Sequence, residues 1–197
     1  MRTGLIVVDM QNAFIDGATS VVGASAVVEA VNRWVSHASD QEWPIFYTRD
    51  VDPTGQDPTG DGSQEAIHRD VVVRGTVVDK GPGSRAGFSG FVLASTALPD
   101  GVPGGGGLSG LAGLILAAGL DEVVVVGLAA DVCVAATAVD AVRLGLAVLL
   151  DLDASAFVHA HPGGDEAAVA DLRAAGVLVT RLGDGELPDH VRAVGQR

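Results

Sequence analysis

The chain has 197 residues, a formal net charge of −13 and a single cysteine. This length fits one domain, spanning residues 1–197, with a sizeable core. The negative charge argues against nucleic acid and anionic membranes as partners. One cysteine cannot form an internal disulfide, and the apolar run before Asp9 is too short for a signal peptide or a membrane span, so we expect a cytoplasmic protein.

Short apolar runs alternate with segments of helical periodicity along the chain. The run at 4–8 has no polar alternation, which is typical of a strand covered on both faces. In chain order, the pattern predicts strands at 4–8, 43–48, 76–79, 122–127, 146–152 and 177–180, and helices at 25–38, 108–119, 131–145 and 164–175. This alternation predicts an α/β fold, a parallel sheet with helices on both faces.

Three segments read as irregular. Residues 49–75 are rich in Asp, Gly, Pro and Thr, and form a long connection of the kind that often carries function. The glycine-rich stretch at 99–107 lacks both the preceding strand and the Lys-Ser/Thr pair of a phosphate-binding loop, so we expect a flexible loop without a bound nucleotide. The residues after Thr180 read as a loose terminal tail.

Three distinctive side chains follow predicted strands: Asp9, Lys80 and Cys133. Lys80 is the only lysine in the chain, whose 12 positive side chains are otherwise arginines. Taken singly, Asp9 could cap a turn, Lys80 could be a surface charge, and Cys133 could be a small core residue. Ligands of open parallel sheets bind at the carboxyl ends of the strands, so the joint placement predicts a functional site.

These three residue types can together cleave an amide. A cysteine near a helix N-terminus and beside an ammonium has a setting that favours its thiolate. A nearby carboxylate can accept the thiol proton and pass it to a leaving group, and backbone N–H groups before the helix can hold an oxyanion. No histidine base is needed for this chemistry.

Three motifs resemble one known family. The stretches DMQNAFIDG (9–17), DKGPGSRAGFSGF (79–91) and EVVVVGLAADVCVAATAVDAVRLG (122–145) are similar to those of the isochorismatase-like cysteine hydrolases, and most of all to nicotinamidases. The similarity runs in order from about residue 4 to about residue 180. It implies a three-layer α/β/α sandwich around a six-stranded parallel sheet.

The resemblance also implies roles for individual residues. Cys133 matches the nucleophile, Asp9 the general base, and Lys80 the cation that completes the triad. The N–H groups of Ala129 and Cys133 match the oxyanion hole, with a non-proline cis peptide bond between Leu128 and Ala129. Phe14 and Leu128 match substrate-binding positions.

The chain departs from the family where nicotinamidases usually bind a metal. They use an Asp-x-His pair after the second strand, with further histidines, and the substrate ring sits on the metal. Here Asp50 matches the aspartate, Asp52 stands in place of the histidine, and His68 is the only histidine nearby. We therefore expect no required cofactor, and keep a divalent metal such as zinc on Asp50, Asp52 and His68 as an alternative.

The predicted function is that of an amidohydrolase acting on C–N bonds other than peptide bonds. It would attack a small carboxamide, form a thioester and release ammonia, with nicotinamide as the first substrate to consider. The alternatives are a ureido or carbamoyl substrate, an isochorismatase-type vinyl-ether hydrolysis, and a catalytically idle member that binds a ligand or partner. The resemblance also implies a homo-oligomer.

Overall fold

The computed structural model describes residues 1–17, 19–51, 62–80, 88–91 and 109–191, so the 99–107 loop and Asp52 lie outside the described residues. A six-stranded sheet has the order β3-β2-β1-β4-β5-β6, and every neighbouring pair is parallel. Its strands are β1 (Thr3–Val8), β2 (Ile45–Asp50), β3 (Thr76–Lys80), β4 (Glu122–Leu128), β5 (Ala147–Ala156) and β6 (Leu178–Thr180). The predicted parallel α/β sheet is confirmed.

The described helices are α1 (Asn12–Ile15), α2 (Ala24–Asp40), α3 (Gly110–Ala118), α4 (Cys133–Arg143) and α5 (Gly164–Ala174). The sequence misses α1 because a single turn shows no periodicity. It also ends the fifth strand at Leu152, whereas β5 runs on to Ala156. The added residues stay in the sheet because Ser155 and Ala156 pair with Gly127 and Leu128 of β4, after an irregularity in the register.

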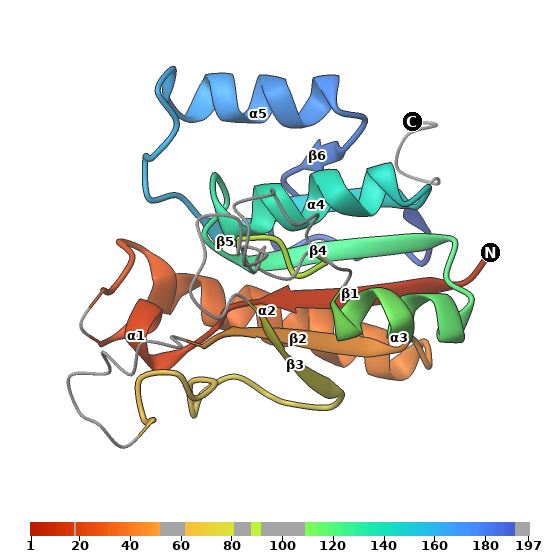
Figure 1. The fold of residues 1–197 in the computed structure, drawn as a ribbon, viewed down its shortest axis with the longest axis horizontal. Helices are drawn as coiled ribbons and strands as arrows, with labels where there is room; N and C mark the ends of the chain where they lie inside the picture. The colour runs from red at the N-terminus through yellow and green to blue at the C-terminus, as the bar shows by residue number, and fades with distance from the viewer. Residues whose placement is uncertain (18, 52–61, 81–87, 92–108, 192–197) are drawn as a thin grey trace, which may run out of the picture.

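The helices cover both faces of the sheet and form three layers (Figure 1). Leu5 and Val7 of β1 belong to the core cluster that contains most of the apolar face of α2. Ile6 and Val8 point the other way, into the cluster shared with α3, α4 and α5. Both faces are therefore buried, which is why the strands read as continuous apolar runs.

The chain reverses its direction of travel across the sheet at β1. From β1 it proceeds to β2 and β3, and then returns to place β4 on the other side of β1. The carboxyl ends of β1 and β4 flank this reversal, the position at which open α/β sheets bind ligands. The strand order thus brings the residues after β1, β3 and β4 to one edge of the sheet.

The segment after β6 is not the loose tail that the sequence predicts. Leu182 and Leu187 pack against the core, and Val191 is buried. The backbone N–H of Val191 donates to Oε2 of the buried Glu122 at 3.0 Å. Apolar contacts and this hydrogen bond therefore fasten the chain as far as Val191. No helix in the described part of the chain has the length and apolar character needed to cross a bilayer.

Gly127 of β4 lies directly against the backbone of β1, and this close approach predicts a large effect on stability. Its φ is +117°, and a Cβ there would lie 2.2 Å from the carbonyl oxygen of Val8. We expect Gly127→Ala to lower the free energy of unfolding by at least about 2 kcal/mol in urea denaturation.

Gly113 in α3 is the matched control, because a Cβ added there meets no described atom within 4 Å. Gly113→Ala is expected to raise the free energy of unfolding by about 0.5–1 kcal/mol through helix propensity. Equal stability of the two variants would contradict the close β1–β4 approach.

Candidate active site

Asp9 follows β1 and is fully buried. Its φ is +49°, a left-handed conformation that aspartate tolerates better than most residues. The backbone N–H of Asp9 donates to the carbonyl of Thr48 at 3.2 Å, and the Thr48 hydroxyl donates to Asp9 Oδ1 at 2.6 Å. The turn therefore holds the Asp9 carboxylate at the carboxyl end of β1, with its Oδ1 hydrogen-bonded to Thr48.

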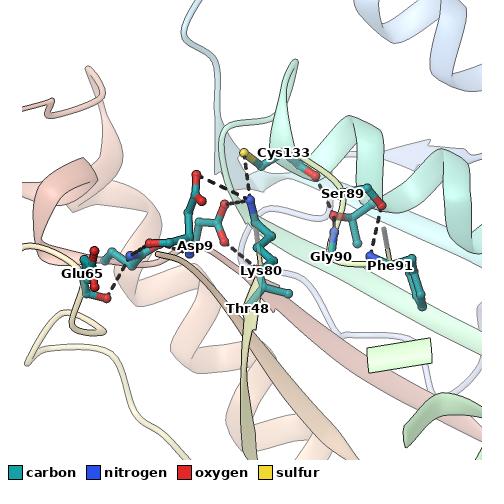
Figure 2. A network of polar contacts seen from close by, with 11 residues as sticks. Asp9, Thr48, Glu65, Lys80, Ser89, Gly90, Phe91 and Cys133 are labelled. Atoms are coloured by element: carbon teal, nitrogen blue, oxygen red, sulfur yellow. Dashed lines mark hydrogen bonds and ion pairs between the residues drawn. The ribbon is translucent and has the colours of Figure 1, made fainter. Parts of the chain in front are cut away.

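Lys80 is the last residue of β3, and its side chain crosses β2 to reach the Asp9 carboxylate. Its Nζ lies 2.9 Å from Asp9 Oδ2, 3.9 Å from Asp50 Oδ2 and 3.6 Å from Cys133 Sγ (Figure 2). The ammonium is fully buried. A buried charge is costly unless it is paired, and the carboxylates of Asp9 and Asp50 supply that pairing.

Cys133 is the first residue of α4 and is 8% exposed. The peptide bond between Leu128 and Ala129, just before it, is cis. The carbonyl of Ala129 accepts hydrogen bonds from the N–H groups of Val132 and Val134. No described residue accepts a hydrogen bond from the N–H of Ala129 or Cys133, so two backbone donors remain on the turn from β4 into α4.

The chain that carries this site is similar in sequence to known hydrolases. A protein-family model described as the isochorismatase domain matches residues 3–184. The chain belongs to the isochorismatase family. It is also 32% identical over 183 residues to the nicotinamidase/pyrazinamidase of Mycobacterium tuberculosis (strain ATCC 25618 / H37Rv), a match that covers 88% of this chain and 95% of that protein.

Solved structures agree with this family fold. The pyrazinamidase of Pyrococcus horikoshii in complex with zinc has a TM-score of 0.72 at 23% identity, over 92% of this chain and 99% of that one. N-carbamoylsarcosine amidase from Thermoplasma acidophilum has a TM-score of 0.68 at 26% identity, over 92% of this chain and 96% of that one. The three-layer α/β/α architecture implied by the motifs is that of the family.

The electrostatics differ from the sequence expectation of a stabilised thiolate. Burial raises the pKa of the Cys133 thiol, and the Asp9 carboxylate raises it further, whereas Lys80 lowers it by less than these two together. Burial lowers the pKa of Lys80, but the neighbouring charges, that of Asp9 above all, outweigh burial and the pKa is raised. These directions favour a protonated thiol beside a charged ammonium, because burial disfavours the thiolate and the Asp9 carboxylate adds to this effect.

Of the proposed metal ligands, Asp50 and His68 lie in the described residues, and they contact different partners. His68 Nδ1 accepts a hydrogen bond from the N–H of Asp70 at 3.2 Å, and Nε2 lies 3.2 Å from Asp16 Oδ2. Both ring nitrogens are thus engaged away from Asp50, whose carboxylate faces Lys80. No group of three or more His, Cys, Asp or Glu side chains in the described ranges is arranged to hold a metal ion.

The two predicted substrate-binding residues have different environments. Phe14 of α1 is partly buried and packs against the core cluster on the α2 side. Leu128 is 1% exposed and belongs to that core. Leu128 therefore offers almost no surface to a substrate, while Phe14 remains partly exposed.

Three polar residues that support the site are not predicted from the sequence. Gln11 holds the end of β2: its Oε1 accepts from the N–H of Asp50 at 2.8 Å, and its Nε2 donates to the carbonyls of Asp50 and Glu65, each at 2.9 Å. Thr48 bonds Asp9, and the Thr137 hydroxyl donates to the carbonyl of Cys133 at 2.7 Å. Gln11 and Thr137 lie inside the motifs at 9–17 and 122–145, which was the available signal.

The raised pKa values of Cys133 and Lys80 predict a loss of stability at alkaline pH. For a group whose pKa is raised by folding, the stabilisation is complete below the unfolded pKa, near 9.0 for the thiol and 10.5 for the ammonium, and is lost as pH rises through the folded pKa. We expect the free energy of unfolding, measured by urea denaturation from pH 7 to 11, to decline above about pH 9.

Cys133→Ala separates the thiol from the other groups. This variant should remove the part of the decline that begins near the unfolded thiol pKa, while Lys80 and Tyr47, whose burial also raises its pKa, stay in both proteins. Identical pH profiles for the two proteins would contradict a buried, protonated thiol.

Proposed function

We propose that the protein is a cysteine amidohydrolase that cleaves a small carboxamide through a thioester on Cys133 and releases ammonia. Family membership and the 32% identity to a nicotinamidase/pyrazinamidase indicate an amidohydrolase acting on C–N bonds other than peptide bonds. The observation that carries the mechanism is the buried cluster of Asp9, Lys80 and Cys133, with the Lys80 ammonium 2.9 Å from the carboxylate and 3.6 Å from the sulfur.

The first half of the reaction transfers the thiol proton to Asp9. Asp9 Oδ1 is held by Thr48, so Oδ2 is the oxygen left to accept this proton. The sulfur then forms a bond to the carboxamide carbon, and the N–H groups of Ala129 and Cys133 donate to the resulting oxyanion. The C–N bond breaks as the nitrogen takes the proton from Asp9, and ammonia leaves a thioester on Cys133.

The second half hydrolyses the thioester. Asp9, again a carboxylate, takes a proton from water while the water oxygen bonds to the thioester carbon. The C–S bond breaks, the sulfur recovers its proton from Asp9, and the carboxylic acid is released. Lys80 keeps its charge throughout and balances Asp9 and the sulfur, because its pKa is raised in this site.

Two observations support the choice of substrate class: the family and the contacts of His68. Nicotinamide is the first candidate, since the Mycobacterium tuberculosis relative is a nicotinamidase/pyrazinamidase. A ureido or carbamoyl compound is the second, favoured by the engaged ring nitrogens of His68, which leave a pyridine ring without the metal anchor. The N-carbamoylsarcosine amidase shares this fold at 26% identity, which also supports that class. Phe14 is proposed to line the pocket, and the homo-oligomer and the cytoplasmic location stay predictions.

An ammonia-release screen over nicotinamide, pyrazinamide and small ureido acids tests the mechanism. We expect turnover of at least one compound, and a loss of kcat of roughly 10³-fold or more in Cys133→Ala, because the nucleophile is removed. Mass spectrometry of acid-quenched reactions should find the acyl group on Cys133. Activity that survives in Cys133→Ala, or an acyl group on another residue, would overturn the proposal.

Chelation tests the metal separately. Because the described donors do not fit a metal ion, we expect dialysis against EDTA to leave kcat and KM for the hydrolysed amide unchanged. Loss of activity that returns on addition of zinc would show instead that Asp50, with Asp52 and a rearranged His68, binds a metal.

A further inference from the structure

Thr48 holds Asp9 in two ways. It is fully buried near the end of β2 and pairs in register with Val8, the residue before Asp9. Its carbonyl accepts from the Asp9 N–H at 3.2 Å, and its hydroxyl donates to Asp9 Oδ1 at 2.6 Å. A threonine hydroxyl has a single proton, so this proton is committed to the carboxylate.

Gly90 closes the other side of Thr48. A Cβ added at Gly90 would lie 2.9 Å from Thr48 Cγ2 and 3.0 Å from Leu111 Cδ2, so the glycine packs directly on the threonine methyl group. Gly90 is itself fixed, because its N–H donates to Thr137 Oγ1 at 3.0 Å and its carbonyl accepts from the Ser109 hydroxyl. With the methyl side packed in this way, the hydroxyl is kept on the side of Asp9.

Thr137 links Gly90 to Cys133 through hydrogen bonds. The Thr137 hydroxyl that accepts from Gly90 donates to the Cys133 carbonyl at 2.7 Å. Figure 2 shows Lys80 between Asp9 and Cys133, with Thr48 below Asp9 and Lys80 and with Gly90 to the right of Cys133. Gly90 is therefore packed between β2, which carries Thr48, and α4, which begins with the nucleophile.

We infer that Thr48 is a positioning residue that orients the Asp9 carboxylate, fixing Oδ1 so that Oδ2 faces Lys80 and the Cys133 thiol. This inference rests on the proposed role of Asp9 as the base. Thr48 is fully buried, so we expect it to make no contact with the substrate, and its loss should affect the proton-transfer steps rather than binding.

Thr48→Val and Thr48→Ser test the hydroxyl while largely keeping the volume of the side chain. We expect Thr48→Val to lower kcat by about 10- to 100-fold with KM unchanged, the range for a lost hydrogen bond to a charged group. Thr48→Ser keeps the donor and should restore most of kcat. If valine is not tolerated, Thr48→Ala gives the same readout.

Thr3→Val is the matched control, because Thr3 is also buried and its hydroxyl donates to a buried carboxylate, Glu122, at 3.3 Å. It lies at the amino end of β1, on the edge opposite the site. Thr3→Val should lower the melting temperature without changing kcat. Equal kcat in Thr48→Val and Thr3→Val, or an equal loss in Thr48→Ser and Thr48→Val, would overturn the inference.

A crystal structure of Thr48→Val supplies a test that needs no substrate. We expect the Asp9 carboxylate to rotate away from its position 2.9 Å from Lys80 Nζ. An unmoved carboxylate overturns the positioning role even if the amidohydrolase function stands. If the wild-type protein hydrolyses no amide in the screen, the proposed function fails. The position of Asp9 in the crystal structure of Thr48→Val then decides the role of Thr48.

Discussion

The buried ion pair between Lys80 and Asp9 is the interaction on which the site depends. Both side chains are removed from water, and their charged atoms are 2.9 Å apart. Either charge alone would be strongly unfavourable at this depth, so each residue requires the other. The strand order makes the pairing feasible: β2 lies between β1 and β3, and the lysine side chain is long enough to cross it. Arginine, with its wide planar head, would meet the same carboxylate in a different geometry.

Burial and the charges around this pair set the protonation state of the Cys133 sulfur. Cys133 sits at a helix N-terminus and near an ammonium, which favours a thiolate. Burial and the carboxylates of Asp9 and Asp50 act in the opposite direction and prevail. A thiol that stays protonated until a substrate is bound needs a base at close range. The arrangement therefore gives Asp9 a chemical task beyond pairing with Lys80.

Around these three residues, buried polar groups fix the geometry. Thr48 bonds the carboxylate, Gln11 holds the backbone of Asp50, and Thr137 bonds the carbonyl of Cys133. Thr48 and Gln11 join segments far apart in the chain, and Thr137, whose bond to Cys133 lies within α4, also accepts from the distant Gly90 N–H, so the site depends on the assembled fold. His68 belongs to a different set of contacts, with Asp16 and Asp70, and this separates it from the carboxylate that faces Lys80.

The sheet, four of the five described helices, and the placement of Asp9, Lys80 and Cys133 at strand ends can be predicted from the sequence alone. These features are predictable because strands and helices have periodicities of two and 3.6 residues, which are local properties of the chain. The folded tail and the full length of β5 are not, since they depend on contacts with the distant residues Glu122, Gly127 and Leu128. The helix α1 is too short to show a periodicity. The supporting hydroxyl of Thr48, the engaged nitrogens of His68 and the protonation of Cys133 were likewise decided only by the tertiary structure. Hydrogen-bond partners, burial and charge balance arise from strand register and packing, which bring together residues that the sequence keeps far apart.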